Sequence, residues 1–244
     1  MAVIRPLQAY RPTPELAAKV ASLPYDVMNS DEARDMAKDN PYSFLHVVKA
    51  EIDLDPSIDL YDKRVYERAR DNLNKLIADG ALVQDQKPQL YIYKEVMQGR
   101  AQIGLVTRTS VDDYLNGVIK IHEFTRADKE QDRINYVDHC DANTGLIFLT
   151  YRPQRKIDAL VNTWIAEHTP VYDFSSDDGI QHTVWTIDAD EVIEQLVLLF
   201  AQVPALYVAD GHHRSASAAK VGQMRRAQHP DLSLIHISEP TRPY

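Results

Sequence analysis

The sequence predicts an α/β fold with an α+β tendency, in which helices flank a mixed sheet. Apolar runs of strand length alternate with apolar stripes at helical spacing along most of the chain. Two neighbouring runs, residues 90–97 and 103–109, flank Gln98 and Gly99, a pattern typical of an antiparallel hairpin. The 244 residues are 44% hydrophobic and 26% charged, so the chain can bury a sizeable core.

Helical spacing and capping residues predict the helices. The first is predicted over residues 14–21, where Thr13 precedes Pro14 at the first helical position. Asn29 or Ser30 is expected to cap a second helix that ends near Lys38. The later helices are predicted from apolar stripes or from runs of helix-forming residues. They cover residues 58–76, 126–139, 157–165, 191–200 and 215–228.

Short apolar runs bounded by turn residues predict the strands. In chain order they cover residues 44–49, 90–97, 103–109, 118–121, 146–150, 171–174, 182–187 and 205–208. Because crossover helices separate some strands while a hairpin joins others, we expect a mixed sheet rather than a purely parallel one.

Charge and composition exclude several classes of protein. The formal net charge is −9 and no basic cluster is visible, so nucleic acid is an unlikely partner. The most apolar stretch, residues 192–208, is interrupted by polar residues and Pro204, so no membrane span is expected. Cys140 is the single cysteine, and no signal peptide precedes it. We therefore expect a cytoplasmic protein without an intrachain disulfide.

Residues 232–244 do not continue the pattern before them. They resemble the translation of a sequencing-library adapter, so we expect an artefactual tail. On this interpretation the natural chain is cut near Asp231 and a further portion is missing. The alternative is an ordinary C-terminal strand, which Leu234, Ile235 and Ile237 could form.

The segment Asp210-Gly211-His212-His213-Arg214 joins an apolar run to a helix-forming run. The start of a helix leaves backbone N–H groups unpaired at a positive dipole end, and Gly211 lets an anion approach closely. Arg214 can bind phosphate or carboxylate, and both histidines can donate to phosphate or move a proton. Asp210 can hold a Mg²⁺ ion through water, accept a hydrogen bond from a ribose hydroxyl, or orient a histidine. The alternative is that Asp210 only caps the helix; a metal centre on two adjacent histidines is disfavoured.

A second cluster follows the predicted strand at residues 118–121. His122 and Glu123 lie just past the end of that strand, where active sites of mixed sheets are often found. Glu123 is a candidate general base, and His122 or Thr125 could position it. The charged run that follows is also explained as a solvated helix face, because Glu130 and Arg133 have the spacing of an ion pair.

These two clusters, together with residues 24–27 (PYDV) and 40–47 (NPYSFLHV), resemble the bacterial family called domain of unknown function 1015. Its Asp-Gly-His-His-Arg segment is similar to the phosphate-binding turn of the ParB/sulfiredoxin superfamily, which includes free-serine kinases. The resemblance implies a ParB/sulfiredoxin-like nucleotide-binding core in residues 111–231. Residues 1–110 would form an N-terminal α/β region packed on it.

The resemblance implies a cytoplasmic kinase that phosphorylates a small molecule from ATP or ADP with Mg²⁺, and free L-serine is the candidate acceptor. Glu123 would be the catalytic base, assisted by His122 and His213. The nucleotide phosphates would be bound by Asp210, Gly211, His212, His213, Arg214, Thr125 and Arg133, and Asp210 would hold Mg²⁺ through water. One alternative is a nucleotide-binding regulatory protein without catalysis. Another is a ParB-like nuclease or DNA-binding protein, which the negative charge disfavours.

Overall fold

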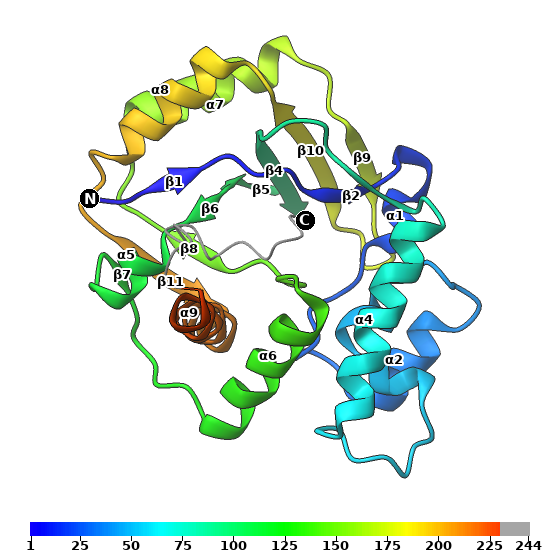
Figure 1. The fold of residues 1–244 in the computed structure, drawn as a ribbon. Coiled ribbons are helices and arrows are strands. Elements are labelled where there is room, and N and C mark those ends of the chain that lie inside the picture. Colours follow the sequence, from blue (N-terminus) through cyan, green and yellow to red (C-terminus); the bar gives the residue numbers. More distant parts are fainter. Residues whose placement is uncertain (230–244) are drawn as a thin grey trace.

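The computed structural model describes residues 1–229 and has the predicted α/β fold (Figure 1). The expectation of an artefactual tail at residues 232–244 lies outside the described residues. Within residues 1–229, no helix combines the length and the apolar character needed to cross a bilayer.

The largest sheet is antiparallel and has the strand order β5-β4-β10-β9. Its central strands are β4 (Leu90–Met97) and β10 (Gln181–Ile187), and its outer strands are β5 (Arg100–Val106) and β9 (Tyr172–Ser175). The predicted hairpin joins β4 to β5, and Gln98 and Gly99 both adopt positive φ at its tip. The sheet takes strands from both sides of the proposed boundary at residue 110, and the division into two regions stays a prediction.

A second sheet has the order β7-β11-β8 and is mixed, as predicted. Its central strand, β11 (Leu206–Asp210), runs parallel to β7 (Ile119–Lys120) and antiparallel to β8 (Phe148–Thr150). Two short ribbons complete the strands: β1 (Ile4–Arg5) pairs with β6 (Arg108–Thr109), and β2 (Tyr10–Pro12) pairs with β3 (Leu82–Gln84).

The helices follow the predicted capping and periodicity in most cases. Asn29 caps α2 through a reciprocal capping box with Glu32, and Pro14 opens a 3₁₀ turn after Thr13. The helical elements are η1 (Pro14–Leu16), α1 (Ala17–Val20), α2 (Ser30–Ala37), α3 (Leu45–Val48), η2 (Ala50–Asp53), α4 (Lys63–Ala78), α5 (Val111–Leu115), α6 (Ala127–Cys140), α7 (Arg155–Glu167), α8 (Asp190–Phe200) and α9 (His212–Gln228).

Two predicted elements are wrong in type or extent. The strand expected at residues 44–49 is the short helix α3, whose Leu45, Val47 and Val48 are buried. A four-residue apolar run carries no periodicity that distinguishes a buried strand from a buried helix, so packing decides. The last helix begins at His212 rather than at residue 215, so the two histidines and Arg214 form its first turn.

Two apolar cores hold these layers together. The first lies between the two larger sheets and the pair α7 and α8, and Ile92, Ile187 and Leu196 are fully buried in it. The second lies between α4 and α6. In Figure 1 α7 and α8 lie side by side at one end of the molecule, and α4, α6 and α9 lie at the other. Helix α9 packs against α6, and its buried residues include the small Ser217 and Gly222.

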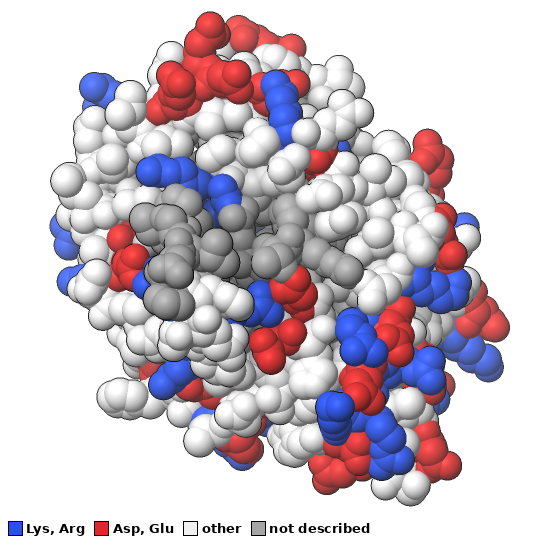
Figure 2. Space-filling view, viewed as in Figure 1, with Lys and Arg blue, Asp and Glu red and all other residues white. Residues whose placement is uncertain are grey.

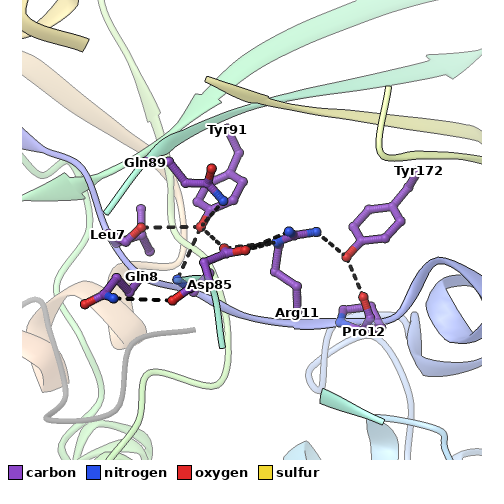
Figure 3. A network of polar contacts seen from close by, with 9 residues as sticks. Leu7, Gln8, Arg11, Pro12, Asp85, Gln89, Tyr91 and Tyr172 are labelled. Carbon is purple, nitrogen blue, oxygen red and sulfur yellow. Dashed lines mark hydrogen bonds and ion pairs between the residues drawn. The ribbon is translucent and has the colours of Figure 1, made fainter. Parts of the chain in front are cut away.

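A polar network fastens the N-terminal segment to the large sheet (Figure 3). The Arg11 guanidinium binds the Asp85 carboxylate, with Nη2 and Oδ1 2.7 Å apart, and its Nη1 donates to the Tyr172 hydroxyl at 2.7 Å. Tyr91 donates to the same carboxylate, and the Arg11 guanidinium lies over the rings of Tyr91 and Tyr172. The Tyr172 hydroxyl donates in turn to the carbonyl of Pro12 at 2.5 Å.

Candidate functional site

The register of the three-stranded sheet brings distant segments of the chain to one edge. Because β7 and β11 are parallel, with Ile119 opposite Leu206, their carboxyl ends meet at the same edge. Because β8 is antiparallel to β11, its start lies there too, with Phe148 opposite Asp210. His122 and Glu123 follow β7, and the predicted anion-binding segment follows β11. The sheet thus places the two sequence clusters side by side.

The turn between β11 and α9 depends on Gly211. This residue has φ +86°, a left-handed conformation that L side chains rarely adopt. A Cβ there would lie 3.1 Å from Cγ2 of Ile147 and 3.2 Å from Nε of Arg214. The first intrahelical bond of the turn runs from the Ser215 N–H to the Gly211 carbonyl at 2.8 Å. The amides that precede Ser215 therefore point from the helix start, where an anion is stabilised.

Arg214 is held against this turn from two sides. Its Nη2 lies 2.6 Å from Oδ2 of Asp210, and its Nη1 donates to the carbonyl of Leu146. The Arg214 side chain is only 15% exposed, whereas that of Asp210 is 64% exposed. The Arg214 Nε is buried and has no hydrogen-bond partner in the described part of the chain. One donor of this guanidinium is therefore unpaired within the described residues.

His212 connects the turn to the second cluster. Its ring meets the ring of His122 edge to face, with centroids 4.4 Å apart. Its Nδ1 lies 3.8 Å from Oε2 of Glu123, whose side chain is 66% exposed. The His212 side chain is only 8% exposed, and its Nε2 has no hydrogen-bond partner within residues 1–229. An accessible carboxylate thus lies beside a buried imidazole at a helix N-terminus.

The other predicted site residues are divided between two places. His213 stays with the turn, and its Nε2 accepts the backbone N–H of Arg126 at 3.3 Å. Thr125 directs its hydroxyl to the Glu130 carboxylate within its own segment. Arg133 lies on α6, and its Nη2 pairs with Oδ2 of Asp132 at 2.6 Å. The interpretation of the charged run after Thr125 as a solvated helix face is wrong for Asp132 and Arg133. Both residues are buried between α6 and its neighbours.

Arg133 borders a small cavity that also reaches Arg214. The Arg133 guanidinium is sandwiched between the rings of Tyr25 and Tyr136, 4.0 Å from each centroid. The cavity has a volume of about 30 Å³. It is lined by Tyr25, Val48, Arg133, Tyr136, Val137, Asn143, Thr144, Gly145, Arg214 and Ser217.

The sequence predicted Arg133 and Arg214 as site residues, but it did not predict Tyr25 or Tyr136. The spacing of Arg133 and Tyr136, one helical turn apart, could have indicated that pair. Burial raises the pKa of Tyr25, although the charges of Arg133 and Arg214 oppose the rise. Tyr25 therefore keeps its hydroxyl proton over a wider pH range and remains a hydrogen-bond donor.

The start of α9 has an exposed carboxylate that suits a magnesium ion, that of Asp210. No group of three or more metal-ligating side chains gathers in the described part of the chain. Mg²⁺ usually keeps several waters and binds one or two carboxylates together with substrate phosphates. The exposed Asp210 carboxylate at the start of α9 has the chemistry for such a contact through water.

Comparison with known proteins adds a family. The sequence profile of a family described as "Protein of unknown function (DUF1015)" matches residues 4–239. The chain belongs to this family. The match spans every described helix and strand of the chain from β1 to α9, and so it includes both halves of the candidate site. No curated protein and no solved structure is similar enough to the chain to count as a match.

Charge on the surface of this DUF1015 protein is mixed. On the face shown in Figure 2, Lys and Arg side chains are interspersed with Asp and Glu, most densely over α2 and α4. Helix α4 carries local ion pairs, such as Lys63 with Glu67 and Arg70 with Asp71. Interspersed charges of both signs lack the continuous basic stripe typical of a surface that binds a nucleic-acid backbone.

Proposed function

We propose that this protein transfers a phosphoryl group from ATP or ADP to the hydroxyl of a small molecule, with L-serine as the first acceptor to test. The observation that carries the proposal is the position of Glu123. Parallel pairing of β7 and β11 sets its carboxylate 3.8 Å from His212, in the first turn of α9. A base and an anion-binding helix start are then side by side, as phosphoryl transfer to an alcohol requires.

The nucleotide phosphates would bind at the start of α9. The backbone amides there and the Arg214 guanidinium supply donors, and Gly211 provides the left-handed residue from which the helix starts. The unpartnered Nε2 of His212 and Nε of Arg214 support a ligand at this place, because buried polar atoms in native proteins normally have partners. Mg²⁺ bound through water to Asp210 would neutralise phosphate charge.

Glu123 would act as the general base. Its carboxylate accepts the proton of the acceptor hydroxyl, and the acceptor oxygen forms a bond to the terminal phosphorus. The bond from that phosphorus to the bridging oxygen breaks, and ADP or AMP leaves with the electron pair. Most of the acceleration in such reactions comes from positioning and charge stabilisation. Removal of a general base costs about 10² to 10⁴ in rate.

The test compares three proteins with L-serine, Mg²⁺ and either ATP or ADP. Wild type is expected to form O-phosphoserine, detected by ³¹P NMR. Glu123→Gln is expected to form O-phosphoserine more slowly by a factor of about 10² or more, while it binds nucleotide as wild type does. Glu194→Gln, an exposed glutamate on α8, is the matched control and should keep full activity.

Two outcomes would contradict the kinase proposal. One is equal turnover in wild type and Glu123→Gln, which would show that Glu123 is not the general base. The other is nucleotide binding without any turnover, equal in both proteins, across serine and other small alcohols. That second result would favour a regulatory nucleotide-binding protein.

A further inference from the structure

We infer that the cavity between Arg133 and Arg214 binds the carboxylate of the acceptor, so that the substrates are short hydroxy acids with or without an amino group. That the ligand is the phosphoryl acceptor rests on the proposed function. That it carries a carboxylate rests on the cavity itself. Arg214 joins the two places because it belongs to the first turn of α9 and also lines the cavity.

The cavity contains guanidinium donors that the protein does not use. Both Nε and Nη2 of Arg133 bind Oδ2 of Asp132, at 3.0 and 2.6 Å. The Arg133 Nη1 takes no part in these bonds to Asp132. The rings of Tyr25 and Tyr136 on either face hold the guanidinium plane in one orientation. A guanidinium so fixed loses little conformational freedom when it binds a planar anion.

Hydroxyl groups lie on the same walls. Tyr25 and Thr144 line the cavity, and Ser217 is fully buried there and donates to the Arg214 carbonyl at 3.1 Å. The cavity volume of about 30 Å³ is about the space of two water molecules, each of which needs about 10–15 Å³. Two water positions are also the space of two carboxylate oxygens.

The remaining donors favour a carboxylate over a phosphate in this cavity. Arg133 is paired with Asp132, and Arg214 is paired with Asp210. The Nη1 of Arg133 is a guanidinium donor that neither pair uses. One such donor matches a singly charged carboxylate better than a doubly charged phosphate with three acceptor oxygens.

Direct binding separates this inference from catalysis. Isothermal titration would use L-serine and D-glycerate, which carry a carboxylate, and L-serinamide, which does not. Wild type should bind the two acids about tenfold or more tightly than the amide, as expected for one charge-assisted hydrogen bond. Arg133→Gln should lose that preference and keep the wild-type affinity for ATP. Arg70→Gln, an exposed arginine on α4, is the control and should behave as wild type.

A second variant tests the cavity without a change of charge. Arg133→Gln leaves Asp132 buried without its partner and can impair folding. Val137→Met extends a side chain that lines the cavity and leaves both ion pairs intact. It should weaken binding of L-serine and D-glycerate about tenfold or more, with the ATP affinity unchanged.

The outcomes distinguish the two proposals. Suppose that L-serine is phosphorylated, that L-serine and L-serinamide bind equally well, and that neither variant changes this. That result would overturn the carboxylate site but support the kinase proposal. Carboxylate binding that both variants abolish, with no phosphoryl transfer to any acceptor, would support the carboxylate site and overturn the kinase.

Discussion

Nδ1 of His212 lies 3.8 Å from Oε2 of Glu123, while Nε2 of the same ring is buried without a hydrogen-bond partner in residues 1–229. A buried polar atom left in this state costs about 1–3 kcal/mol. Natural proteins carry such costs mainly where a function requires them. Stability and activity should therefore respond in opposite directions when this imidazole is changed.

His212→Phe tests that opposition. Phenylalanine keeps a ring against His122 but removes both nitrogens, so no buried donor or acceptor is left unpaired. We expect the free energy of unfolding to stay equal or rise, while kcat for phosphoryl transfer falls about tenfold or more because Glu123 loses the group that positions it. Urea denaturation and steady-state rates measure the two effects. Lower stability with unchanged kcat would assign His212 a structural role only.

Gly211→Ala tests the turn itself. Left-handed backbone costs a residue with a side chain about 1–2 kcal/mol, and the added Cβ would also press on Ile147 and Arg214. We expect a loss of at least that size in the free energy of unfolding, together with weaker nucleotide binding. Gly104→Ala is the control, because a Cβ there meets no atom within 4 Å and its φ is not positive. A variant of Gly211 as stable as the control would show that the turn relaxes without cost.

Local signals predict much of this fold. Val65, Ala69 and Leu73 recur at helical spacing in the sequence, and they are the face of α4 that the structure buries. Gly211 between an apolar run and a helix-forming run predicts a strand-to-helix junction from the chemistry of one residue. The run at residues 44–49 is too short for such a signal, and α3 is determined by the helices packed around it.

The cavity lies beyond sequence reasoning for a different reason. Tyr25, Arg133 and Arg214 come from three distant segments, and only tertiary packing brings them together. The small residues of α9 that permit close contact with α6, such as Ser217, read in the sequence simply as helix formers. Because both segments follow strands, the sequence supports a hypothesis that Glu123 and His212 lie close together. The distance between their side chains depends on the parallel register of β7 and β11.

The pair His46 and Asp53 gives the protein a pH-dependent stability. The hydrogen bond that His46 donates to the Asp53 carboxylate raises the pKa of His46 above 6.5. Burial acts to raise the pKa of Asp53, but the bonds from His46 and Asn72 outweigh it and hold that pKa below 3.8. The His46 contribution is complete below pH 6.5 and is lost as pH rises through the raised pKa. The Asp53 contribution is present above pH 3.8 and is lost as pH falls through the lowered pKa.

His46→Gln should therefore lower the free energy of unfolding only between the lowered pKa of Asp53 and the raised pKa of His46, where both side chains are charged. Near pH 5.5 wild type should exceed the variant in free energy of unfolding by up to about 1 kcal/mol, since both side chains are partly exposed. The difference should shrink as the pH is raised to 8. Urea denaturation at a series of pH values measures it, and a difference that grows with pH would reverse the assigned sign.

Asp85→Asn tests the network that fastens the N-terminal segment. The Asp85 side chain is 9% exposed and that of Arg11 is 25% exposed, so the substitution leaves a largely buried guanidinium without its counter-charge. We expect a loss of about 3 kcal/mol in the free energy of unfolding, the lower end for breaking a buried pair, because Arg11 keeps some contact with water. Asp71→Asn breaks an exposed pair on α4 and should cost much less.

A double variant distinguishes the charge from the packing. Arg11→Met with Asp85→Asn removes the unpaired charge while a long side chain still packs between Tyr91 and Tyr172. If the cost of Asp85→Asn is mainly the isolated guanidinium, the double variant should regain part of the lost stability. If instead the loss reflects the bond from Tyr91 to Asp85, the double variant should be no more stable than Asp85→Asn alone.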